Sequence, residues 1–163
     1  MAGFTLFELV IVIVIIAVLA AVFLDRVQAN LEAAERMAME TQARAISSAL
    51  QLQMAAMITR GRGHELGSLT RTNPMDWLVA KPPNFLGELS AEPKGEEALG
   101  NWYYDQDARQ LVYLVRRGES FTADAQGRKQ VRYAVVAIYD ESDRSRNYVA
   151  GMLFQPVEPY RWR

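Results

Sequence analysis

The chain has 163 residues, a net charge near −1, no cysteine and a single histidine, His64. Its length suits one domain of ordinary size, and its nearly neutral charge gives no reason to expect a nucleic acid as partner. The lack of cysteine excludes a disulfide framework, thiol catalysis and cysteine-ligated zinc, and one histidine excludes a histidine-rich metal site. Composition therefore argues against cysteine enzymes and against most metalloenzymes.

The first element is an apolar segment from Phe4 to Leu24, which only Thr5 and Glu8 interrupt. About 20 apolar residues cross a bilayer as an α-helix. Val and Ile are common in the segment, but it is far too long for a strand, and a single strand cannot satisfy its backbone hydrogen bonds in lipid. The sequence therefore predicts a transmembrane helix over residues 4–24.

Glu8 separates three interpretations of this segment. A cleavable secretory signal needs a basic leading region, which Met1-Ala2-Gly3 does not supply. A simple signal anchor fits the length but leaves Glu8 unexplained, because an unpaired carboxylate in lipid costs on the order of several kcal/mol. In the third interpretation the helix packs against copies of itself, and Glu8 meets a buried cation of another subunit.

An α-amino group is the nearest candidate for this cation, because cleavage between Gly3 and Phe4 would create one four residues before Glu8. The run from Gly3 to Leu9, GFTLFEL, resembles the processing motif of the type IV pilin superfamily, which includes type IV pilins and type II secretion pseudopilins. The resemblance implies that a prepilin peptidase cuts after Gly3 and N-methylates Phe4. It also implies that Glu8 pairs with the N-terminus of an adjacent subunit during assembly.

By this resemblance the chain is a structural subunit of a type IV pilus-like filament and not an enzyme. It would be stored in the bacterial inner membrane as a single-pass protein with a periplasmic soluble domain, and then enter a periplasmic or extracellular filament. The implied partners are identical or related subunits, the prepilin peptidase, an inner-membrane platform protein and an assembly ATPase.

Two alternatives remain open. One is a pseudopilin of a type II secretion system. The lack of cysteine favours a pseudopilin or a minor pilin, because many major type IV pilins have a C-terminal disulfide loop. The other is a membrane-anchored periplasmic binding domain that has kept a pilin-like anchor.

The chain departs from the usual pattern of this family at two places. The leader, residues 1–3, has no Lys or Arg, although such residues hold a leader in the cytoplasm. Many major pilins also have a glycine within the helix and a proline near its end, where this chain has Ala17 and Asp25. Because neither helix breaker is present, we expect a more continuous helix than in those pilins.

The soluble domain is expected to comprise residues 25–163, and residues 25–60 should continue the helix because they contain no Gly or Pro. Glu32 with Arg36 and Glu40 with Arg44 are pairs spaced four residues apart, which we expect on the solvent face. A stripe of apolar residues at helical spacing should pack on a sheet. Its members are Val27, Leu31, Ala34, Ala38, Ile46, Leu50, Met54 and Met57.

Residues 61–100 contain many Gly and Pro residues and are expected to form a long connection. A short helix should begin within it, with Asn73 as N-cap and Pro74 at the first position. Trp77 and Phe85 are expected to hold this connection against the domain.

Residues 101–163 are rich in aromatic and β-branched residues over 102–104, 111–115, 131–139 and 148–154. Short links between consecutive strands favour an antiparallel sheet of about four strands with the long helix on one face. The predicted fold class is α+β, with a long N-terminal helix whose first half is transmembrane. This agrees with a pilin-like architecture.

The sequence contains no phosphate-binding glycine loop, no GxSxG and no HExxH motif, so we expect no catalytic residues and no cofactor. A calcium site is one further hypothesis, because Asp140, Asp143 and Asn147 could supply oxygen ligands and some pseudopilins bind calcium near their C-terminal end. Their spacing fits no defined ligand loop, and a solvated acidic turn is the simpler interpretation. The C-terminal residues 160–163 are expected to pack on the domain or to contact a neighbouring subunit.

Overall fold

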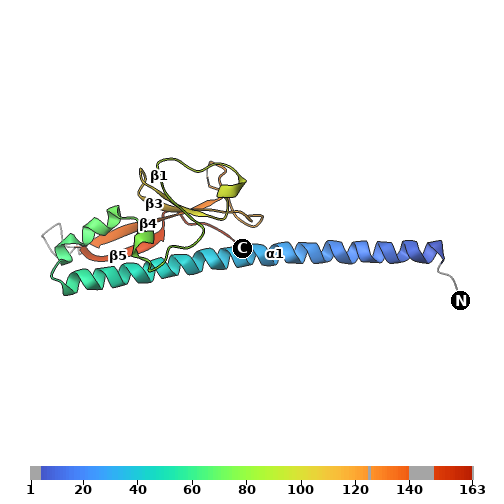
Figure 1. Cartoon of the computed structure of the whole chain (residues 1–163), viewed down its shortest axis with the longest axis horizontal. Coiled ribbons are helices and arrows are strands. Elements are labelled where there is room, and N and C mark those ends of the chain that lie inside the picture. The colour runs from blue at the N-terminus through green and yellow to red at the C-terminus, as the bar shows by residue number, and fades with distance from the viewer. Residues whose placement is uncertain (1–4, 125, 140–148, 163) are drawn as a thin grey trace.

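The computed structural model describes residues 5–124, 126–139 and 149–162. One very long helix lies along one face of a five-stranded sheet, so the fold is α+β, as expected (Figure 1). The elements are α1 (Leu6–Thr59), β1 (Phe85–Leu89), β2 (Trp102–Asp105), β3 (Gln110–Leu114), β4 (Gln130–Tyr139) and β5 (Val149–Pro156). Short 3-10 helices η1 (Gly63–Arg71), η2 (Pro74–Trp77) and η3 (Glu96–Ala98) lie in the connections.

Helix α1 has a clear signal at each end. The Thr5 hydroxyl accepts a hydrogen bond from the Glu8 backbone N–H at 3.2 Å and so caps the first turn. At the other end Gly61 adopts a φ of 73°, and the amides of Gly61 and Arg62 donate to the carbonyls of Ile58 and Met57, both at 2.9 Å. This is the Schellman pattern of a helix C-terminus. The 54 residues between are helical throughout, as the lack of Gly and Pro predicts.

The sheet differs from the expected antiparallel sheet of about four strands. Strands β2 to β5 do form an antiparallel meander, but β1 adds a fifth strand at the edge, and it pairs in parallel with β2. Residues 61–100 are therefore not only a connection. A parallel neighbour needs a long crossover, which residues 90–101 supply with η3. Strand β1 is hard to recognise because it is short and irregular, with Gly87 at a φ of 100°.

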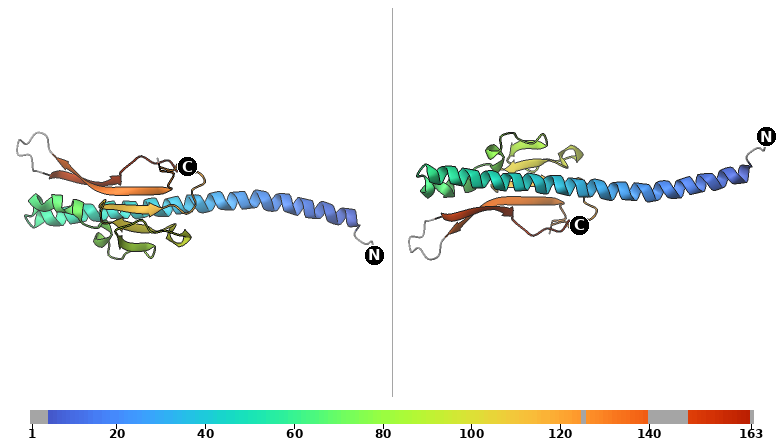
Figure 2. Two further views of the ribbon diagram at one scale, coloured as in Figure 1. Left: turned by 90° about the horizontal axis from the view of Figure 1, so that it is seen from above. Right: turned by 90° about the horizontal axis from the view of Figure 1, so that it is seen from below.

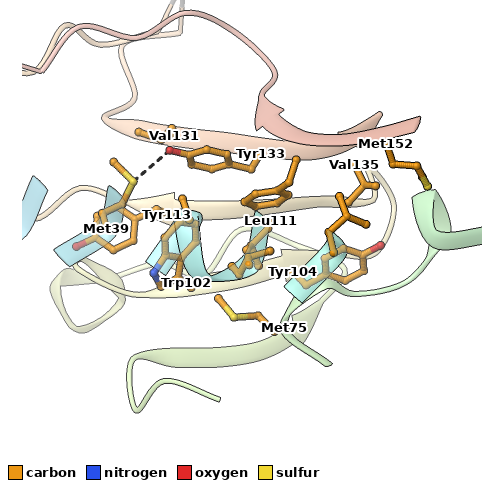
Figure 3. Close-up of a cluster of buried hydrophobic side chains, with 14 of the residues drawn as sticks. Met39, Met75, Trp102, Tyr104, Leu111, Tyr113, Val131, Tyr133, Val135 and Met152 are labelled. Atoms are coloured by element: carbon orange, nitrogen blue, oxygen red, sulfur yellow. Dashed lines mark hydrogen bonds between the residues drawn. The ribbon is translucent and has the colours of Figure 1, made fainter. Parts of the chain in front are cut away.

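The main core lies between α1 and the sheet. From the helix, Met39, Ile46 and Leu50 are buried in one cluster with β-strand side chains. Figure 3 shows Met39 with Trp102 and Tyr133 in this cluster. The Tyr133 hydroxyl lies 3.4 Å from the Met39 sulfur. A smaller cluster on the opposite face of the sheet contains Ala98, Tyr103, Val112 and Leu114.

Two predicted features of residues 61–100 are confirmed, namely the start of a short helix and the packing of its aromatic residues. Helix η2 begins at Pro74, and the Asn73 side chain accepts from the Met75 amide at 3.0 Å. Trp77 and Phe85 are half-buried and pack against the main core.

Candidate functional site

The first section of α1, Leu6 to Leu24, projects beyond the sheet and the rest of the domain (Figures 1 and 2). All of its residues are exposed, although nearly all are apolar. Among the described residues, α1 is the one helix long and apolar enough to cross a membrane. Because this section is fully exposed, it does not form part of the core of the chain's own domain.

Glu8 lies on the first turn of this section and is exposed. Its carboxylate makes no hydrogen bond and no ion pair with any residue that the structure describes. The helix dipole stabilises a negative charge at the helix N-terminus. In an apolar environment this stabilisation is too small to compensate the Glu8 carboxylate for the loss of its hydration. Gly3 and Phe4, the other residues of the predicted processing site, lie outside the described residues.

The second section of α1, Val27 to Thr59, has one face on the domain and one face open. Between these residues, all of which the structure describes, Arg44 is the only exposed charged residue. Arg44 lies 3.9 Å from Glu40, so this predicted ion pair is confirmed. The remaining exposed residues are Gln28, Ala29, Asn30, Leu31, Ala33, Ala34, Met37, Ala38, Thr41, Ala45, Ser48, Gln51, Leu52, Ala55, Ile58 and Thr59.

This open face is unusual for a helix on a soluble domain. Such helices carry charged residues on the side that faces water. Here six of the exposed residues are alanine, and Leu31, Met37, Leu52 and Ile58 are more than 40% exposed. Small residues allow two helices to approach closely. The open face adjoins the exposed apolar surface of the first section. Along α1 the exposed charged residues with described side chains are only Glu8, Arg26 and Arg44, so the surface is nearly uncharged.

The predicted apolar stripe is correct in its second half and wrong in its first half. Ile46, Leu50 and Met57 are buried in the core and Met54 packs against it, whereas Leu31, Ala34 and Ala38 are exposed. The helix has two apolar faces. The predicted stripe follows the exposed face up to Ala38 and the buried face from Ile46 onward. In the first half the face toward the domain carries Glu32, Glu35 and Arg36 in place of apolar residues.

Glu32 was expected on the solvent face with Arg36, and this prediction is wrong. Only 6% of Glu32 is exposed, and its Oε1 accepts from the Ser120 amide and from the Trp162 indole N–H, both at 2.9 Å. Trp162 is itself buried, so within the C-terminal residues it is this side chain that packs on the domain. The carboxylate is buried at low cost because strong donors surround it.

Glu35 forms the second half of the same arrangement. Its carboxylate accepts from the amides of Arg116 and Arg117 at 2.7 and 2.9 Å and from the Tyr113 hydroxyl at 3.0 Å. Burial, with the neighbouring Glu35 charge, raises the pKa of Tyr113 above its ordinary value. We call the two carboxylates the Glu32–Glu35 clamp. They attach the loop that follows β3 to α1, close to the point where the helix leaves the domain.

The remaining predicted sites yield no ligand site. Asp140, Asp143 and Asn147, the calcium candidates, lie outside the described residues. In the described part of the chain there is no group of three or more His, Asp or Glu residues placed to hold a metal ion. His64 is exposed and lies 3.6 Å from Glu65.

Comparisons of the chain with protein-family models, with curated proteins and with solved structures find no match. Function is therefore inferred from the residues of this chain alone.

Proposed function

We propose that the protein is a structural subunit of a type IV pilus-like filament. The observation that supports the proposal is the nearly uncharged surface along α1, which includes the exposed apolar section from Leu6 to Leu24 and the open face of the second section. A membrane anchor needs only the first section to be apolar. Burial among neighbouring helices gives a reason for the second section to carry so little exposed charge as well.

The dimensions of α1 suit two environments in turn. Residues 6–24 extend roughly 28 Å as a helix, which matches the hydrocarbon core of a bilayer. In the membrane this section is covered by lipid, while the open face of the second section is in water. In a filament both would be covered by helices of other subunits. Removal of the helix from lipid is then offset by packing against those helices, and the alanines permit close approach.

Glu8 gives this assembly its register. On the proposal, a prepilin peptidase cuts after Gly3, and the N-methylated Phe4 amine of one subunit pairs with Glu8 of its neighbour. The described residues of the same chain supply no cation to Glu8. A buried ion pair of this kind contributes modest net stability, but loss of one partner leaves an uncompensated charge that costs about 3–5 kcal/mol. Misaligned helices would incur this cost at every subunit.

Intact-mass measurement of the protein purified from its own cells tests the processing step. The mass should correspond to loss of Met1 to Gly3 and gain of one methyl group, and a Gly3→Val variant should keep its full length. A wild-type chain that keeps these three residues and has no methyl group would instead support the membrane-anchored binding domain.

The platform protein and the assembly ATPase are partners that this function requires. A pseudopilin of a type II secretion system would use α1 and Glu8 in the same way. Deletion of the gene separates the two: a pilus subunit is needed for surface filaments, and a pseudopilin is needed for export of secreted enzymes.

A further inference from the structure

A cavity of about 370 Å³ lies between α1 and the loop that follows β3. It is lined by Gln28, Glu32, Arg116, Arg117, Gly118, Glu119 and Lys129. Three of these side chains, Arg116, Arg117 and Lys129, are cationic and exposed. Two are carboxylates: Glu119 is exposed, and Glu32 is buried and accepts hydrogen bonds from Ser120 and Trp162. Three cations against two carboxylates leave the lining with a small net positive charge.

Hydrogen bonds fix the position along α1 of the loop that carries the cationic side chains. The amides of Arg116 and Arg117 donate to Glu35, which is the second half of the Glu32–Glu35 clamp. The Lys129 ammonium donates to the Gly118 carbonyl at 2.6 Å. The stem of Lys129 packs closely on Gly118, since a Cβ there would lie 3.0 Å from the Lys129 Cδ.

This position along α1 corresponds to the headgroup layer of a membrane. The apolar section ends at Leu24, and the two α1 residues that line the cavity, Gln28 and Glu32, follow four and eight residues later. They lie roughly 6 and 12 Å beyond Leu24, and the polar layer on each side of the hydrocarbon core is about 5–8 Å thick, so the near end of the cavity lies within this layer. When residues 6–24 span the bilayer, the cavity therefore faces the phosphates of the adjacent leaflet.

We propose that this cavity binds the headgroup phosphate of an anionic phospholipid. The guanidinium of Arg117, which also lies 3.9 Å from the Glu35 carboxylate, and the ammonium of Lys129 are suited to phosphate oxygens. A lipid without a cationic headgroup brings no competing positive charge. Bound lipid holds the soluble domain in a fixed orientation on the membrane surface before assembly. The inference rests on the membrane-spanning part of the proposed function and not on filament formation.

Native mass spectrometry of the full chain tests this site. The protein is released from mixed micelles that contain equal amounts of phosphatidylglycerol and phosphatidylcholine with the same acyl chains. Wild-type protein should retain phosphatidylglycerol in preference. The double variant Arg117→Gln, Lys129→Gln should lose this preference by roughly fivefold for each cation removed. The matched control Arg60→Gln, Arg62→Gln makes the same charge change at the far end of α1 and should behave as wild type.

Three results would overturn the proposal. Equal retention of the two lipids by wild type shows that no anionic-lipid site exists, and an equal loss in the control variant shows that net charge alone is responsible. Displacement of the bound lipid by millimolar inorganic phosphate would assign the cavity to free phosphate instead. Circular dichroism of both variants confirms that they fold.

Flotation with pure phosphatidylcholine vesicles separates this inference from the proposed function. Protein that floats with these vesicles but shows no lipid preference overturns the lipid site alone. Protein that does not float at all overturns the membrane-spanning helix and the lipid site together.

Discussion

The Glu32 carboxylate accepts a hydrogen bond from the Trp162 indole N–H at 2.9 Å, across 130 residues of sequence. The contact joins α1 to the C-terminal end of the described chain, and the Arg36 guanidinium adds a second link by donating to the Trp162 carbonyl at 2.6 Å. Glu32 also accepts from the Ser120 amide. One buried carboxylate therefore holds two distant segments against the helix at the place where it leaves the domain.

We expect Glu32→Ala to destabilise the domain by about 2 kcal/mol, because buried donors on Ser120 and Trp162 would lose their charged acceptor. Thermal unfolding of the detergent-solubilised protein, followed by tryptophan fluorescence, measures the change. Glu65→Ala removes an exposed glutamate and should have little effect. Equal stabilities of the two variants would show that the clamp contributes nothing.

Gly118→Ala should also destabilise the domain, by about 1–3 kcal/mol. A Cβ at this position would lie 2.9 Å from the Val115 Cγ1 and 3.0 Å from the Lys129 Cδ. Gly63→Ala is the matched control, since its nearest neighbour would be 4.0 Å away. Chemical denaturation should place the midpoint of Gly118→Ala well below that of Gly63→Ala, and the opposite order would contradict the packing of this loop.

The contribution of Asp124 to stability should depend on pH. Burial alone would raise its pKa, but hydrogen bonds from the Arg128 amide, the Gln130 side chain and the Gln126 amide hold the pKa below its ordinary value. A lowered pKa in the folded state gives stability that is present above the unfolded-state pKa of about 3.9 and is lost as the pH falls through the folded-state value. Wild type should therefore be more stable than Asp124→Asn at pH 7, and this difference should shrink in acid. A difference that is independent of pH would show that the Asp124 charge plays no part.

Glu8→Ala should leave processing largely intact and prevent assembly, because the N-terminal amine of the neighbouring subunit would lose its partner. Glu8→Asp keeps the charge on a shorter side chain and should retain part of the assembly. Electron microscopy of sheared cell-surface filaments measures the outcome, and immunoblotting confirms that each variant is present. Normal filaments from Glu8→Ala would refute the role assigned to this carboxylate.

Much of the fold follows from local sequence signals. The length of α1 follows from the lack of Gly and Pro before Gly61, and η2 follows from the Asn73-Pro74 pair. Strands β2 to β5 lie within two residues of the predicted ranges, because their aromatic and β-branched residues are continuous. Strand β1 was missed because its five residues include glycine and its partner is parallel.

The candidate site was predictable only in part. The apolar section can be recognised in the sequence from its length and composition. Glu8 can be recognised as a candidate because an unpaired carboxylate is unfavourable in lipid. The position of Glu32 could not be predicted, since its partners Ser120 and Trp162 are 88 and 130 residues away. The open face could not be predicted either. Apolar residues repeat at helical spacing on both sides of α1, and only the folded structure shows which side the domain covers.

Protection of a single introduced thiol tests the central claim, that neighbouring subunits cover the open face of α1. The chain has no cysteine, so Ala38→Cys places one reactive group on this face. Treatment with a polyethylene glycol maleimide and gel electrophoresis then reports whether the face is accessible. We predict that the thiol is protected in purified filaments and labelled once detergent has separated the subunits. Equal labelling before and after dissociation would contradict the account.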